Sequence, residues 1–142
     1  MRDIPVSTLG DVGITYDEVD VSALQDALKN ALDGQGNFSL DFGGPFDNSA
    51  AVAASGTGAA AALSGSHTVL QPLNGGNTAR SFGIYIGIQG FWATGDPVFG
   101  ATDCIIVSKY NVNPAAGTYS ARIVTAGSKV NNPAWGTAAI TA

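Results

Sequence analysis

Few side chains in this 142-residue sequence are of the types that perform catalysis. His67 is the only histidine and Cys104 the only cysteine, which excludes metal sites built from paired histidines and excludes intrachain disulfides. A histidine can serve as a general base and a cysteine as a nucleophile. However, Cys104 lies in the apolar run of residues 104–107, which predicts a buried strand and not the helix N-terminus that stabilises a thiolate. We interpret His67 as a surface or hydrogen-bonding residue and expect no catalytic residues.

Three acidic residues, Asp17, Glu18 and Asp20, form the second cluster that could do chemistry. Carboxylates that precede a helix can hold a calcium ion, and they can equally cap the helix and interact with its dipole. We favour capping, and we expect neither a metal ion nor a cofactor. The glycine-rich stretches at 56–58 and 87–90 lack the Lys and Ser/Thr of a phosphate-binding loop, which indicates turns or close packing.

Two tryptophans, Trp92 and Trp135, have the side chain that stacks on sugar rings. A sugar-binding adhesin is therefore one class of protein that the sequence allows. In a small β-rich domain, tryptophan more often belongs to the core or to an interface, and we favour that interpretation.

The composition favours a protein whose surface is covered by partners. Charged residues make up only 12% of the chain, about half the usual share for a soluble domain. The net charge of −5 argues against DNA binding through a basic patch. Residues 1–47 hold nine acidic side chains, whereas residues 48–142 hold two acidic side chains and four basic ones, including Arg80 and Lys109. This asymmetry suits head-to-tail contacts between identical copies, and ordinary solvated charges would also produce it.

The length is suited to one domain, which we place at residues 1–142. Residues 1–5 lack the apolar region of a signal peptide, and no apolar stretch approaches the roughly 18 residues that cross a bilayer. We expect a chain that is made and folded in the cytoplasm and that has no membrane partner.

The first third of the sequence predicts a strand, a helix and a second strand. Alternating apolar residues predict a strand over 12–16. An apolar stripe with an acidic start and a glycine stop predicts a helix from Asp20 to Leu32. A second alternation predicts a strand over 37–42, on which the helix would pack.

The rest of the sequence predicts a long loop and then β-structure. Residues 43–66 are mostly Ala, Gly and Ser, which predicts a loop or a loop with a short helix inside 48–62. A loop of this length does not offset its own ordering entropy, so we expect a neighbouring subunit to order it. The predicted fold class is mainly β with one flanking helix. The later strands are expected at 68–73, 82–89, 98–102, 104–112, 118–125 and 135–141.

The segment Glu18-Val19-Asp20-Val21-Ser22-Ala23-Leu24, with Phe38-Ser39-Leu40, Gly43 and Phe46-Asp47 after it, resembles the tail tube proteins of long-tailed bacteriophages (siphoviruses). In that family an acidic residue, a Val-Asp-Val-Ser/Thr-Ala helix start, a glycine stop and a strand ending near Gly-x-Phe-Asp recur in this order. The resemblance covers the first third of the chain in its motifs and the remainder in outline.

The resemblance implies a β-sandwich or half-barrel flanked by one helix, and a homo-oligomer of six copies per ring. Stacked rings would form the hollow tail tube, through which viral DNA passes without specific binding. An acidic lumen fits this role because it repels the phosphates. The protein would then belong to the phage tail of the virion, would assemble in the host cytoplasm, and would have other tail or head proteins as partners.

The resemblance also implies which segments contact neighbouring subunits or rings, namely the N-terminal arm 1–9 and the loop 43–66. The strand 82–89 would form part of the barrel wall, where glycine permits close contact between subunits. The predicted interface residues are Phe46, Asp47, Val52, Leu63, Arg80, Gly83, Tyr85, Gly87 and Lys109.

The short chain and its low charge would also suit a second hypothesis, a decoration or cement protein that stabilises a phage capsid. That protein would be a binding module and not a conduit. The tube, the decoration protein and the adhesin all act by binding, and an enzyme is the class that the sequence favours least.

Overall fold

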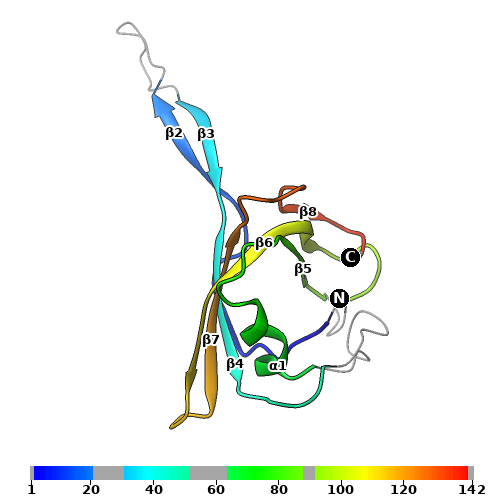
Figure 1. Cartoon of the computed structure of the whole chain (residues 1–142). Coiled ribbons are helices and arrows are strands. Elements are labelled where there is room, and N and C mark those ends of the chain that lie inside the picture. Colours follow the sequence, from blue (N-terminus) through cyan, green and yellow to red (C-terminus); the bar gives the residue numbers. More distant parts are fainter. Residues whose placement is uncertain (1, 21–30, 52–63, 88–91, 141–142) are drawn as a thin grey trace, which may run out of the picture.

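The computed structural model of this chain describes residues 2–20, 31–51, 64–87 and 92–140. It shows a mainly β protein in which a six-stranded sheet curls into a half-barrel, with one short helix beside it (Figure 1). A two-stranded hairpin extends away from one end of this sheet (Figure 1). The expectation of a mainly β chain is confirmed.

The hairpin consists of β2 (Thr15–Asp20) and β3 (Ala31–Asn37). In the larger sheet the strands lie in the order β1–β4–β7–β6–β5, and β8 also pairs with β6. Helix α1 (Ser66–Leu70) leads directly into the 3-10 turn η1 (Gln71–Leu73). The strands of the larger sheet are β1 (Thr8–Leu9), β4 (Ser39–Pro45), β5 (Arg80–Tyr85), β6 (Val98–Asn113), β7 (Thr118–Thr125) and β8 (Ala134–Gly136), all paired antiparallel.

The helix predicted from Asp20 to Leu32 is wrong at both ends. Asp20 closes β2 and lies opposite Ala31, which opens β3. Residues 21–30 lie outside the described residues. The physical reason is that β3 and β4 form one continuous extended segment, interrupted only at Phe38. Its first part pairs within the hairpin and its second part pairs within the larger sheet. At the two described ends, the strand pairing of Asp20 with Ala31 and of Val19 with Leu32 overrides the helical spacing.

A change of partners along β6 curls the sheet. The first part of β6 pairs with β5 on one side and with β8 on the other, and the part from Ile105 onward pairs with β7. Between the two parts, Asp103 adopts a positive φ of 47°. Its N–H donates to the hydroxyl of Ser81 at 3.1 Å, and its carbonyl accepts the N–H of Val130 at 2.8 Å. These two bonds hold the irregular backbone that bends the strand.

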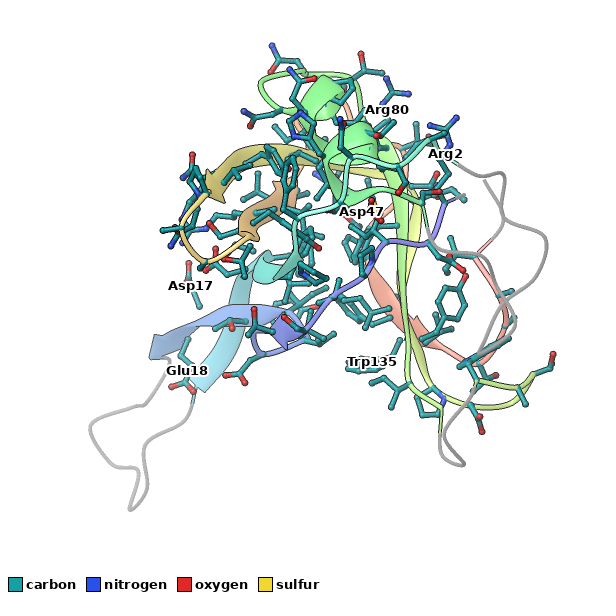
Figure 2. All side chains as sticks on the ribbon, turned by 90° about the horizontal axis from the view of Figure 1, so that it is seen from below. Arg2, Asp17, Glu18, Asp47, Arg80 and Trp135 are labelled. Carbon is teal, nitrogen blue, oxygen red and sulfur yellow. The ribbon has the colours of Figure 1, made fainter. Side chains whose placement is uncertain are left out.

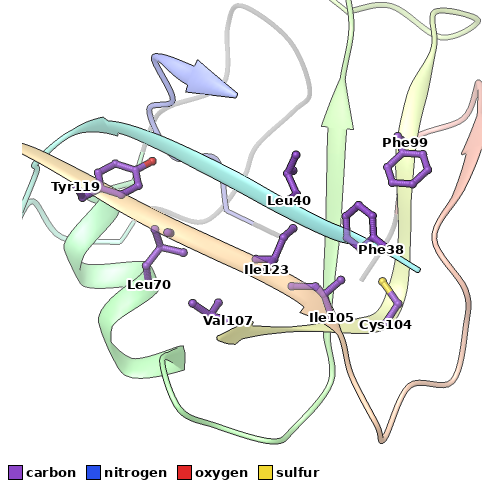
Figure 3. Packing of buried hydrophobic residues seen from close by; sticks show 10 residues of the cluster. Phe38, Leu40, Leu70, Phe99, Cys104, Ile105, Val107, Tyr119 and Ile123 are labelled. Atoms are coloured by element: carbon purple, nitrogen blue, oxygen red, sulfur yellow. The ribbon is translucent and has the colours of Figure 1, made fainter. Parts of the chain in front are cut away.

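The hydrophobic core lies on the inner side of this bend. On β7, the buried residues Tyr119, Ala121 and Ile123 alternate with exposed ones, as a strand with one covered face requires. The ring of Phe38 lies 5.4 Å from those of Phe82 and Phe99. The buried cluster comprises Phe38, Leu40, Leu70, Phe99, Cys104, Ile105, Val107, Tyr119, Ala121 and Ile123 (Figure 3).

The strand predicted over 68–73 is wrong, because this segment forms α1 and η1. Pro72 lies in the first turn of η1, where its missing N–H is tolerated. Leu70 is only 4% exposed and joins the core from the helix. The segment thus covers the inner face of the sheet instead of extending its edge.

The other strands agree with the sequence in place and differ in extent. The hairpin of β6 and β7 is confirmed, with Gly117 at a φ of +64° in its turn. β2 begins at Thr15, after most of the strand predicted over 12–16. β5 ends at Tyr85 and β8 ends at Gly136, so both are shorter than predicted.

The buried thiol of Cys104 should make the protein less stable at alkaline pH. Burial raises the pKa of this thiol to about 11 from its ordinary 9.0. A raised folded-state pKa contributes stability that is complete below about pH 9 and is lost as the pH approaches 11. We expect the midpoint of urea unfolding to fall across this range, and to fall less steeply for Cys104→Ala. Equal slopes for the two proteins would contradict this assignment.

Candidate assembly surfaces

The β2–β3 hairpin is the surface that most needs a partner. Among the described strands, none pairs with either outer edge of the hairpin. A two-stranded hairpin is at best marginally stable alone in water. Tyr16 on β2 is 49% exposed and lies across Gly36, where an added Cβ would come within 2.8 Å of the ring. The hairpin therefore presents an aromatic side chain to solvent.

Acidic residues gather on the same hairpin. Asp17 and Glu18 are exposed, and the register places Glu18 opposite Asp33. Asp17, Glu18 and Asp20 all lie on β2, and the residues 21–30 that would follow a capping residue lie outside the described residues, so the helix-capping role stays a prediction. In the part of the chain that the structure describes, no three or more Asp, Glu, His or Cys side chains are grouped to hold a metal ion. The hairpin is thus a negatively charged extension.

A set of hydrogen bonds joins the two ends of the segment 48–65. The hydroxyl of Ser66 donates to the Pro45 carbonyl and accepts the N–H of Asp47, both at 3.1 Å. The N–H of His67 donates to the Asp47 carbonyl at 2.9 Å. Ser66 is fully buried, so these bonds fix the base of the segment on the sheet.

Asp47 uses its carboxylate within its own chain. The carboxylate accepts the hydroxyl of Ser49 at 2.5 Å and the N–H of Ser49 at 2.8 Å. These hydrogen bonds lower the pKa of Asp47. The predicted interface residues Val52 and Leu63 lie in 52–63, outside the described residues.

An aromatic cluster adjoins the base of this segment. His67 lies on α1 with its Nδ1 3.0 Å from the hydroxyl of Tyr110, and its ring is 5.1 Å from that of Phe46. This confirms the interpretation of His67 as a hydrogen-bonding residue. Phe46 is 40% exposed at the edge of the cluster, which is consistent with a contact to another molecule.

The N-terminal arm lies on its own sheet. β1 pairs with β4, so that Thr8 lies opposite Gly43 and Leu9 opposite Phe42. The buried hydroxyl of Tyr119 donates to the Pro5 carbonyl at 2.7 Å. The arm is thus bound to its own sheet. Its contact with a neighbouring subunit stays a prediction.

One face of β5 is covered by the C-terminal segment. The hydroxyl of Tyr85 accepts the N–H of Ile140 at 3.0 Å, and a Cβ on Gly83 would lie 3.2 Å from the Ile140 side chain. The group that lies close to Gly83 is therefore Ile140 of the same chain, whereas the sequence predicted a neighbouring subunit there. Arg80 and Gly87, at the two ends of this region, are exposed.

The two tryptophans differ in environment. Trp92 is 6% exposed, donates its indole N–H to the Asp96 carbonyl at 3.1 Å, and meets Tyr85 edge to face. It is a packing residue and offers no open face to a sugar. Trp135 is 54% exposed and has its ring 5.1 Å from that of Phe99.

The outer face of the sheet is polar and carries one ion pair. Arg122 on β7 donates to both carboxylate oxygens of Asp41 on β4, at 2.7 and 3.0 Å. This bond lowers the pKa of Asp41 and raises that of Arg122. Lys109 lies opposite Arg122 on β6 and is exposed. The three side chains form one row across three strands with a net charge of +1.

The structure thus distributes the predicted interface residues over separate places. Phe46 and Asp47 meet at the base of the 48–65 segment, and Gly83 and Tyr85 meet on β5. Lys109 lies apart from both, on the outer face of the sheet. The alternation over 12–16 predicts a buried Tyr16, whereas this side chain is exposed on the hairpin. The pair of Asp41 and Arg122 has no local signal in the sequence, because the register of two distant strands creates it.

Comparisons with protein-family models, curated proteins and solved structures find no match to this chain. Among the helices that the structure describes, none is long and apolar enough to span a membrane. The functional proposal therefore depends on the residues and surfaces of this chain.

We expect Tyr119→Phe to loosen the N-terminal arm. The substitution leaves the Pro5 carbonyl without its donor, which costs about 1–2 kcal/mol of stability. The amides of Ser7 and Gly10, which bond to β4, should then exchange their protons faster in hydrogen-exchange measurements. Tyr110→Phe is the matched control, because Tyr110 stacks on Tyr119 and makes its hydrogen bond to His67. Equal protection of both amides in the two variants would contradict the role of Tyr119.

Proposed function

We propose that this chain is a virion structural protein whose copies assemble head to tail into stacked, six-membered rings of a phage tail tube. The observation that carries the proposal is the β2–β3 hairpin, an acidic extension with no third strand in the described part of the chain. An uncovered hairpin of this kind gains stability when another molecule covers it. The tail-tube motifs between residues 18 and 47 favour a second copy of the chain as that molecule.

The distribution of charge supports a head-to-tail arrangement. Asp17 and Glu18 lie on the hairpin, and Arg2 and Arg80 lie away from it on the body (Figure 2). The two arginines share their crevice with Asp3 and Asp103, so the hairpin is acidic and the crevice carries charges of both signs. Attraction between opposite charges on two separate surfaces joins copies in one direction, which produces rings or filaments and not closed symmetric pairs.

The outer face of the curled sheet has few free cations to bind DNA, although its charged row is not the acidic surface expected of a lumen. On β4, β7 and β6 this face carries Asp41, Arg122 and Lys109, and two of these charges neutralise each other. Its other positions are mostly small or polar, among them Ser39, Asn111, Ser120 and Thr118. A face with so few free cations does not hold phosphates by counterion release.

A capsid decoration protein is the alternative function. The short chain and its charged fraction of 12% support it, because such a surface also suits attachment to a preformed shell. Negative-stain microscopy of the purified protein separates the two. Rings or tubes of uniform bore support the tube, whereas particles that bind only to capsids would replace it with decoration.

Charge reversal tests which surfaces meet. We expect Arg80→Glu to raise the concentration needed for assembly by about five-fold at low salt and by less at high salt, because it places an acid opposite the acidic hairpin of the next copy. Light scattering across a concentration series measures this threshold. Adding Glu18→Arg should restore assembly of the Arg80→Glu protein.

Lys109→Glu is the matched comparison, since it makes the same charge change on the outer face of the sheet. If neither Arg80→Glu nor Lys109→Glu changes the concentration needed for assembly, the electrostatic argument is wrong. Rescue of Lys109→Glu by Glu18→Arg, without rescue of Arg80→Glu, would place the contact on the outer face instead.

A further inference from the structure

The edge of β4 is shaped to receive an extended backbone. A Cβ on Gly44 would come within 2.5 Å of the Pro5 carbonyl oxygen. A Cβ on Gly43 would lie 2.6 Å from the Tyr119 carbonyl oxygen and 3.1 Å from the Thr8 hydroxyl. Gly44 therefore gives this edge a slot for the arm that a larger residue would close, and Gly43 lets both β7 and the arm approach closely.

Main-chain atoms make most of the hydrogen bonds in this slot. The N–H groups of Ser7 and Gly10 donate to carbonyls of β4, each at 2.8 Å. At the start of the arm, the Asp3 carbonyl accepts a hydrogen bond from the N–H of Ser64 at 2.6 Å. Together with the bond from Tyr119 to Pro5, these contacts are those of β-strand addition, in which an extended segment docks on a sheet edge.

The link from the docked arm to β2 packs on the core through Val12 and Ile14 and is open around Gly13 between them. Residues 10–14 line an open hollow of about 440 Å³ beside Ser39 and Asp41. Within this link, Gly13 adopts a φ of +149° and an added Cβ would meet no atom within 4 Å. Glycine in open space gives the link the freedom to change direction.

The docked arm also leaves apolar side chains uncovered. Val6 is 45% exposed and Leu9 is 48% exposed. Both line a crevice of about 1060 Å³ on the inner side of the half-barrel, which Ile84 of β5 lines as well. Among the described residues of one copy, none therefore fully covers Val6 and Leu9 of the docked arm.

We propose that the slot on β4 accepts the N-terminal arm, residues 2–9, of a second copy, so that assembled subunits exchange these strands. The proposal deepens the self-assembly proposed above and rests on it. The contacts of the arm are the same in either case because the sequence is the same, so the cost of exchange lies only in the link. Five residues reach up to about 17 Å when extended, which limits exchange to adjacent copies.

Cysteine cross-linking of the full-length chain tests the exchange. Leu9 and Phe42 lie directly opposite each other, at a spacing that suits a disulfide in an antiparallel pair. Leu9→Cys and Phe42→Cys proteins are mixed in equal amounts, brought to assembly, oxidised with glutathione disulfide and run on a non-reducing gel. With complete exchange, about half of the chains should form covalent dimers, because half of the arms meet a slot of the other variant.

The native Cys104 provides a built-in control. It is buried, and its raised pKa keeps it a protonated thiol at pH 8, so wild-type protein should form no dimers. The double variant Leu9→Cys/Phe42→Cys, kept dilute, should form an intrachain bond, which shows that both positions are native. If Phe42→Cys does not fold, Gly10→Cys and Asp41→Cys supply the next rung, where the Gly10 N–H bonds to the Asp41 carbonyl.

The outcomes separate the exchange from the assembly itself. Covalent dimers in the mixture support exchange. Assembled particles without covalent dimers would overturn exchange and leave the proposed tube intact. Absence of both particles and dimers at every concentration would overturn both proposals.

Discussion

The register between β4 and β7 is the constraint on which the rest of the structure depends. It pairs Ser39 with Val124 at one end and Pro45 with Thr118 at the other, so that Leu40 and Ile123 face the core together while Asp41 and Arg122 face outward. A slip by one residue would exchange these two faces. The same strand continues back into β3, so this register also fixes where the hairpin leaves the body, and its edge holds the N-terminal arm.

Each surface proposed for assembly is therefore tied to this strand. The hairpin at one end carries exposed Asp17 and Glu18, and the slot at Gly43 and Gly44 lies in the other half of β4. At its far end, Pro45 accepts the hydrogen bond from Ser66 that fixes the base of the 48–65 segment. A rigid strand that joins three surfaces keeps them in fixed relation, which a repeating assembly of identical copies requires.

The strands of the body could be predicted from the sequence, and the elements on either side of them could not. Alternation at Phe38 and Leu40 reports a half-buried strand, and Gly117 marks the turn between β6 and β7. The apolar spacing that ends at Leu32 fits a helix, and the pairing of Leu32 with Val19 makes that end of it a strand. Pro72 suits a strand edge and a 3-10 turn alike. Pairs such as Asp41 with Arg122 depend on register, which no local pattern contains.

The central claim is that this chain covers its hairpin and its sparsely charged surface with other copies of itself. Sedimentation velocity of the wild-type protein over a wide concentration range tests it most directly, because it needs no substitution and no partner. We predict that the monomer gives way to discrete large species as the concentration rises, with ring-sized particles among them. A single monomeric boundary at every concentration and salt strength would contradict the account.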